Sequence, residues 1–182
     1  MEDTTISIIG IIIASILMLV VPLILIADRA DDVSQLIVQT RTSEFVNEIV
    51  KSGKLTNDQY QKFLDQLISS GNTYEVDMEI KILDENTSKI VTDSDYTKIG
   101  NNTYYSIFTS QIEDIIAKSG EDVNNNIEGR ILLKQGDMIS VTVKNSSKTL
   151  SQSLKSFYYN IVGSDIHIIT ATASGIVAIN GT

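Results

Sequence analysis

The chain contains an apolar run that is too long and too uniform to be an ordinary core helix. Residues 6–27 read ISIIGIIIASILMLVVPLILIA and include no ionisable side chain. As an α-helix these residues extend about 33 Å, which matches the roughly 30 Å hydrocarbon core of a bilayer. Because lipid offers the backbone no hydrogen-bond partners, a helix is the conformation that we expect for this run.

The residues before the run distinguish an anchor from a cleaved signal. A secretory signal has a basic start and a short apolar core, whereas this chain opens with MEDTT and continues into a longer core. We therefore expect residues 1–27 to be a retained anchor that crosses the cell membrane once.

Three residues inside the run bear on what the anchor does. Gly10 and Ala14 lie one helical turn apart and form a small-xxx-small pair, which lets a second helix approach closely. We expect a helix-packing face at these two residues, although small residues are also common in spans that only tether a domain. Pro22 lacks a backbone N–H and crowds the carbonyl of Met18, so we expect a helix kink there.

Helical character is expected to continue past the anchor, over residues 28–52, because no Pro or Gly occurs between Ala27 and Ser52. The apolar positions change faces along this extension. One stripe consists of Val33, Leu36, Ile37 and Thr40, and a second, on roughly the opposite face, of Val38, Thr42, Phe45 and Ile49. The later half is expected to pack on the protein's own domain, while the earlier half meets another surface or the helix breaks.

Residues 53–182 are expected to form a globular head. Thr56 and Gln59 have the spacing of a capping box, and the apolar residues of 60–68 recur at helical intervals until Gly71. Residues 74–82 alternate between apolar and charged side chains, which predicts a strand with one buried and one open face.

The remaining segments predict further helices and strands. Residues 104–118 are expected to be a helix, with Phe108 among the inward side chains, although TYYSIF also fits the start of a strand. Further expected elements are strands at 130–134, 138–144, 165–173 and 175–179 and a helix from Ser147 to Gly163. The strand at 165–173 is expected to be central, because residues 166–169 are apolar on both faces. The order of elements predicts an α+β fold, with helices on one face of a mostly antiparallel sheet.

Composition excludes most enzyme chemistry. The chain has no Cys and one His, which leaves no thiol nucleophile, no thiolate metal site and no His-rich metal site. The formal net charge of −9 argues against nucleic-acid binding. We expect no enzyme activity, no catalytic residue, no cofactor and no bound metal.

Individual polar residues do not change this expectation. His167 beside Asp165 is expected to be an ordinary strand histidine, because catalysis needs a positioned partner in a cleft. Asp93 and Asp95 have the spacing of part of a calcium loop, but Lys98 stands where such a loop needs Gly. The acidic residues after the anchor are expected to form a hydrated collar, or alternatively to bind a cation or a basic partner. They are Asp28, Asp31 and Asp32.

The layout resembles that of pilin-like proteins. A short N-terminus, an apolar helix with a late proline, a helical continuation and a C-terminal α+β head are shared features. TSEFVNEIVKSGKLTNDQYQKFLDQLISSGNTYEVDMEIKILDEN (residues 42–86) and GDMISVTVKN (136–145) are similar to clostridial membrane-anchored proteins of Tad/Flp-type pilus or type II secretion-like machinery. Pilin precursors carry a basic leader and a glutamate five residues into the mature helix. The only acids before the apolar run here are Glu2 and Asp3.

The resemblance implies a function based on association. The protein would be a minor pilin or pseudopilin, a structural subunit or assembly factor whose head lies outside the cytoplasmic membrane. Its partners would be the lipid bilayer and other pilin-like subunits or assembly-platform membrane proteins, in a homo- or hetero-oligomer. The alternative is a membrane-tethered extracytoplasmic sensor or ligand-binding module.

Counting basic residues near the anchor leaves its orientation undecided, because Arg29 and Arg41 follow it and Asp residues surround Arg29.

Overall fold

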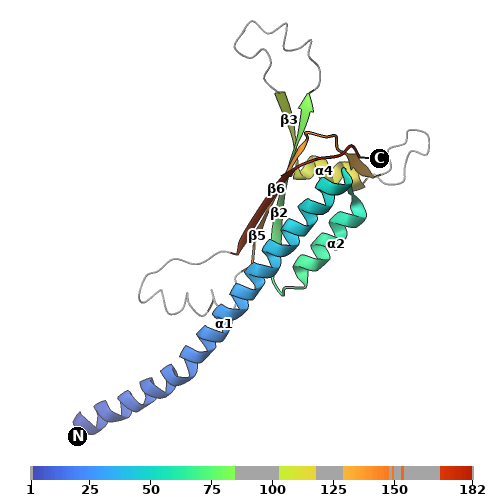
Figure 1. The fold of residues 1–182 in the computed structure, drawn as a ribbon. Coiled ribbons are helices and arrows are strands. Elements are labelled where there is room, and N and C mark those ends of the chain that lie inside the picture. The colour runs from blue at the N-terminus through green and yellow to red at the C-terminus, as the bar shows by residue number, and fades with distance from the viewer. Residues whose placement is uncertain are drawn as a thin grey trace, which may run out of the picture.

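A computed structural model describes residues 2–84, 103–117, 129–147, 149, 153 and 169–181. Figure 1 shows a long N-terminal helix that carries an α+β head near its C-terminal end. The elements are α1 (Glu2–Ser52), β1 (Lys54–Thr56), α2 (Asn57–Ile68), β2 (Tyr74–Asp84), β3 (Thr103–Phe108), α4 (Thr109–Ala117), β4 (Arg130–Leu132), β5 (Met138–Asn145) and β6 (Thr170–Ile176). The expected α+β class is confirmed.

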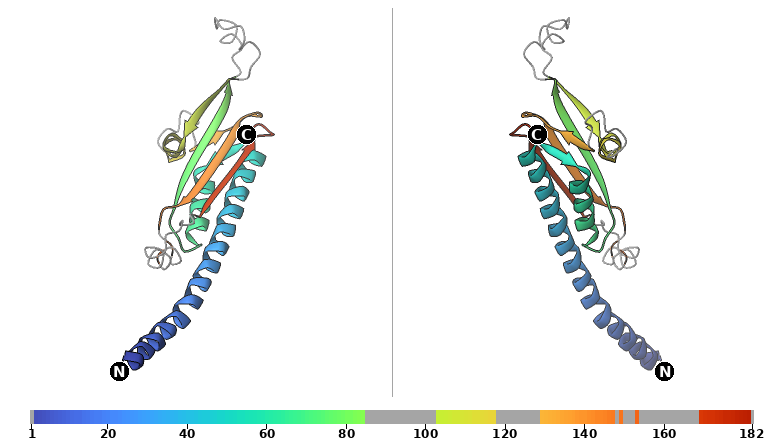
Figure 2. Two further views of the ribbon diagram at one scale, coloured as in Figure 1. Left: turned by 90° about the vertical axis from the view of Figure 1, so that its left-hand side faces the viewer. Right: turned by 90° about the vertical axis from the view of Figure 1, so that its right-hand side faces the viewer.

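Helix α1 runs without interruption for 51 residues and differs sharply between its two ends. Its N-terminal part projects away from the head, and its C-terminal part lies along the sheet (Figures 1 and 2). The stripe expected to face the domain is buried, with Val38, Thr42 and Ile49 each fully inaccessible. Val33 and Leu36, from the opposite stripe, are exposed. The expected division of the helix into two stripes is therefore confirmed.

Within the described residues the main sheet has four antiparallel strands in the order β3-β2-β5-β6, and β1 pairs with β4 in a separate two-stranded sheet. Met78 of β2 pairs with Val141 of β5, which in turn pairs with Ala173 of β6. Because side chains alternate between faces, this register gathers the apolar residues on one face. Residues of α1, α2 and α4 join them in a single core. The charged side of β2 forms the open face, as expected.

Helix α2 follows the predicted pattern closely. The Thr56 side chain accepts a hydrogen bond from the Gln59 backbone, and the Gln59 side chain accepts one from the Thr56 backbone, which completes the capping box. Tyr60, Phe63 and Leu67 are buried. The ring of Phe63 stacks on that of Phe45 of α1, with centroids 4.3 Å apart. The helical spacing thus identified the face that packs on α1.

Small residues on β6 allow α1 to approach the sheet. The inward positions of this strand are Ala171, Ala173 and Gly175. A Cβ atom at Gly175 would lie 2.7 Å from a methyl carbon of Val50, which is closer than carbon atoms can approach. Glycine is therefore required where the end of α1 crosses the sheet.

Two expectations about the later elements are wrong. Residues 104–108 form strand β3 rather than the start of a helix, and Phe108 is 57% exposed instead of inward. The strand ends where the Thr109 hydroxyl accepts a hydrogen bond from the backbone N–H of Met78 (2.7 Å). Up to Phe108, pairing with β2 therefore determines the conformation of this segment, although its apolar residues have helical spacing.

The expected strands near the C-terminus also need correction. β6 continues through Gly175 to Ile176, so the separate strand expected at 175–179 does not form. β6 lies at an edge of the sheet, not at its centre, among the described residues. Contact with α1 buries its inward side, where Ala171 is 4% exposed. Residues 166–168, on which the expected central position rested, lie outside the described residues. The helix expected from Ser147 to Gly163 falls almost wholly outside the described residues.

The end of α1 and the C-terminal segment meet in a close backbone contact. Gly53 has φ +66°, and its carbonyl accepts a hydrogen bond from the N–H of Leu133 (2.8 Å). The carbonyl of Leu133 in turn accepts one from the N–H of Gly181 (2.8 Å). A Cβ atom at Gly53 would lie 2.6 Å from the Gly181 nitrogen. The contact therefore requires glycine for both its conformation and its lack of a side chain.

We predict that Gly53→Ala lowers the free energy of unfolding by about 2–4 kcal/mol, since it adds a backbone clash to the unfavourable φ. Gly71→Ala is the matched control, because Gly71 also has positive φ (+85°) but open space around its Cβ position. Its cost is expected to be about 1 kcal/mol. Both free-energy costs can be measured by urea unfolding of the full chain in detergent, with the near-UV circular dichroism of tyrosine as the signal. Equal costs would show that the contact with Gly181 does not constrain the fold.

Candidate functional site

The exposed part of α1 is the most unusual surface of the molecule. Its apolar side chains, including Ile11 (68% exposed) and Met18 (82% exposed), project from the helix without contacting the head. In length and composition this is the one helix, within the described residues, that could cross a membrane, and its most apolar window has no buried part. Such a surface requires an apolar partner, either lipid or other helices.

The predicted packing residues all lie on this exposed part. Gly10 and Ala14 are exposed and one turn apart, and nothing lies within 4 Å of a Cβ atom placed at Gly10. A contact at this face would therefore involve another molecule. Pro22 lies inside α1 without interrupting it, and the projecting part of the helix curves smoothly (Figure 2).

The head begins immediately after the apolar run. Ala27 is 5% exposed and Ser34 is 7% exposed, so burial of α1 starts at the last residue of the run. The Gln35 side chain donates a hydrogen bond to the carbonyl of Thr170 (2.7 Å) and accepts one from its N–H (3.0 Å). Asp31 accepts a hydrogen bond from the buried hydroxyl of Thr149 (2.8 Å). This joint leaves no linker between the apolar segment and the head.

The joint also changes the interpretation of the acidic residues after the anchor. Asp31 belongs to the joint rather than to a hydrated collar, whereas Asp32 remains exposed. Gln35 was not identified from the sequence, because a lone glutamine between apolar stripes carries no pattern. Its role depends on Thr170, which is 135 positions away in the chain.

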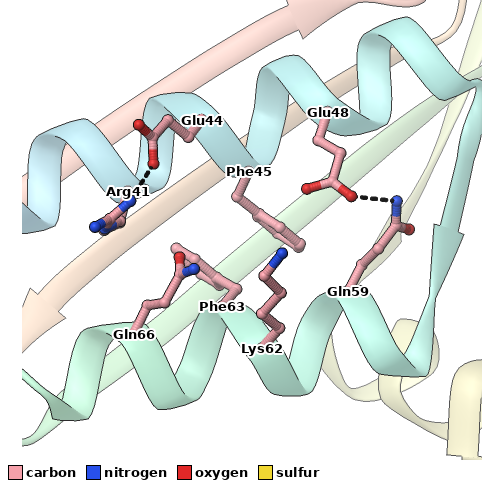
Figure 3. A pocket seen from close by; sticks show the side chains of 8 residues that line it. All are labelled: Arg41, Glu44, Phe45, Glu48, Gln59, Lys62, Phe63 and Gln66. Carbon is pink, nitrogen blue, oxygen red and sulfur yellow. Dashed lines mark hydrogen bonds and ion pairs between the residues drawn. The ribbon is translucent and has the colours of Figure 1, made fainter.

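A hollow of about 210 Å³ lies between α1 and α2 (Figure 3). The stacked rings of Phe45 and Phe63 lie beneath a charged rim. In the rim Arg41 pairs with Glu44 (2.6 Å), and Gln59 donates to Glu48 (3.0 Å). Acidic and basic groups balance there, so the hollow favours no particular class of ligand.

A second hollow, of about 480 Å³, lies on the open face of the sheet. Its lining includes Asp77, Glu79 and the exposed ring of Phe108. Asp77 accepts a hydrogen bond from the Lys144 ammonium (3.0 Å), which raises the pKa of that lysine, and Glu79 accepts one from the Ser106 hydroxyl (2.8 Å). Both carboxylates thus have protein partners.

The one strongly shifted titratable group in the described part of the chain is structural. Burial and a hydrogen bond to Glu113 (2.7 Å) raise the pKa of the Tyr60 hydroxyl. This bond ties α2 to α4 inside the head. No group of three or more His, Cys, Asp or Glu side chains within the described residues is arranged to hold a metal ion. His167, Asp93 and Asp95 lie outside those residues.

The chain matches no family model, no curated protein and no solved structure.

We predict that Gln35→Glu destabilises the joint between α1 and β6 by about 1 kcal/mol. A carboxylate still accepts the Thr170 N–H but cannot donate to its carbonyl. Gln39→Glu is the control, because it adds the same charge one turn along an exposed part of α1. Hydrogen exchange at Thr170 in the full chain measures the effect. Equal protection in the two variants would contradict the role of Gln35.

Proposed function

We propose that the protein is a pilin-like structural subunit or assembly factor of a pilus or secretion-type filament. It is anchored in the cell membrane by residues 1–27 and carries its head on the extracytoplasmic side. Its partners are the bilayer, other pilin-like subunits and assembly-platform membrane proteins.

The observation that carries the proposal is the continuity of α1. One helix forms both the exposed apolar segment and part of the core of the head. A subunit that packs through its helix needs a fixed relation between helix and head, so that every copy presents its head in the same way. A simple tether has no such need, and a flexible linker would serve it as well.

A second candidate is a membrane-tethered sensor or ligand-binding module. The hollow beside Phe108 supports it, because small-molecule sites combine an apolar wall with a few polar groups. The carboxylates of this hollow already have protein partners, however, so we place this function second.

The orientation of the head provides the first test. We predict that protease added to intact cells without their wall removes the head, because the proposed filament forms outside the membrane. Lysed cells are the control for cleavage of a protected domain. A head that survives until the membrane is opened would contradict both the orientation and the filament function.

The second test concerns the helix face. We predict that Gly10→Leu and Ala14→Leu leave membrane levels unchanged but abolish co-purification of partners, because bulk at these positions prevents close approach of helices. Pro22→Ala is the control, since it restores a backbone donor without filling the face. If both leucine variants assemble like the parent, the face is not a contact and the sensor function is favoured.

A further inference from the structure

The two edges of the main sheet lack the protection that edge strands usually have. Residues 103–112, which contain β3, and residues 169–181, which contain β6, include no Asp, Glu, Lys or Arg. Neither segment contains proline. Exposed edges normally carry charge or proline because their backbone groups can pair with another chain. An uncharged pair of edges in a chain of net charge −9 therefore calls for a pairing partner.

The backbone of β6 is open on its outer side beyond Thr170, where Gln35 of α1 occupies the edge. Both backbone groups of Thr170 bond to Gln35, so they point away from β5. Backbone direction alternates along a strand, and Thr172, Ser174 and Ile176 therefore point the same way as Thr170. Their side chains are exposed, and among the described residues their outward N–H and C=O groups have no recorded partner.

The backbone of β3 is open over part of its length, since the outward N–H of Phe108 already donates a hydrogen bond to the Gln111 side chain (3.1 Å). Met78 bonds to Thr109, which shows that Met78 directs its backbone groups toward the β3 side of β2. By alternation Ile80 and Ile82 also direct their backbone N–H and C=O groups toward β3, where Ile80 pairs with Ile107 and Ile82 pairs with Tyr105. Tyr104 and Ser106, one residue out of phase, must then direct their backbone groups outward.

The number of strands makes the two edges complementary. Because four antiparallel strands alternate in direction, β3 and β6 run in opposite directions. A second copy in the same orientation therefore presents its β3 antiparallel to the β6 of the first. The strands run beside α1, so copies with parallel α1 helices meet edge to edge (Figure 2). Copies anchored in one membrane have this relation, and in that respect the inference rests on the proposed function.

We propose that the partner is a second copy of this chain, and that β6 of one copy pairs with β3 of the next. The register places Ile176 opposite Tyr104, Ser174 opposite Ser106, and Thr172 opposite Phe108. At each end of this register an exposed aromatic ring lies opposite a β-branched side chain: Tyr104 (37% exposed) opposite Ile176 (60%), and Phe108 (57%) opposite Thr172. Pairs of aromatic and β-branched residues are favourable across antiparallel strands. If β3 were shifted by two residues along β6, one of the two aromatic rings would lose the β-branched side chain opposite it.

The inward side of the same register brings Tyr105, which is 54% exposed, opposite Gly175, whose inward face already contacts Val50 of α1. Because different edges of the two copies meet, the contact does not close on itself and can repeat from copy to copy.

Cysteine cross-linking tests the register directly, because the native chain has no Cys. Hydrogen-bonded partners in antiparallel strands have Cα atoms about 5.5 Å apart, which suits a disulfide. The full chain with Ser106→Cys and Ser174→Cys, oxidised in lipid vesicles, is expected to give a ladder of covalent multimers. A mixture of the two single variants is expected to stop at dimers. Ser69→Cys with Ser174→Cys is the control, since Ser69 is exposed on the turn after α2.

Two outcomes overturn the inference. One is a double variant that has native circular dichroism but stays monomeric. The other is dimer formation by Ser174→Cys alone, which would mean that identical edges meet. Adding Ile176→Lys should reduce the ladder at least tenfold, whereas Ile68→Lys, at an equally exposed position of α2 (65%), should not.

The helix-face variants separate this inference from the proposed function. If Gly10→Leu abolishes partner binding while the double cysteine variant forms no ladder, the edge contact is wrong and the filament function stands. If the ladder forms and Gly10→Leu and Ala14→Leu change nothing, the edge contact stands and association through the helix is wrong.

Discussion

The contact between α1 and the sheet determines the rest of the architecture. Val38, Val46 and Ile49 are nearly inaccessible to solvent, and each such side chain contributes about 1.5–3 kcal/mol by burial. Their close packing depends on Ala171, Ala173 and Gly175, which leave room for the helix. Because this contact is part of the core, the head cannot fold without fixing the direction of the apolar segment.

A fixed direction has consequences for association. Gln35 bonds to Thr170 of β6 and Asp31 bonds to Thr149, so the sheet edges keep a constant orientation relative to the apolar helix. If that helix lies across a bilayer, both edges face sideways, toward other copies in the same membrane. In the proposed assembly the helix and the edges would then provide two contacts at different heights, and neither would require a mobile linker.

Sequence periodicity is sufficient to predict an element and its buried face where that burial depends on one neighbouring element. The capping box at Thr56, the apolar stripe of α2 and the alternation of β2 all predicted the structure, because local spacing determines which side chains are buried. Phe108 was misassigned because its segment fits a helix locally and becomes a strand only through pairing with β2. Gln35 and the edge position of β6 depend on contacts between distant residues, which spacing along the chain does not encode.

Charge distribution explains why the edges, rather than the faces, suit association between copies. The open face carries Glu75, Asp77 and Glu79, of which Asp77 pairs with Lys144 and Glu79 lies near Lys81. Contact between two such faces would remove these exposed ion pairs from water, and that desolvation opposes the contact. The edges carry no charge and offer unpaired backbone groups, which gain hydrogen bonds on contact. In the proposed assembly, edge-to-edge pairing would therefore avoid the desolvation that contact between the charged faces requires.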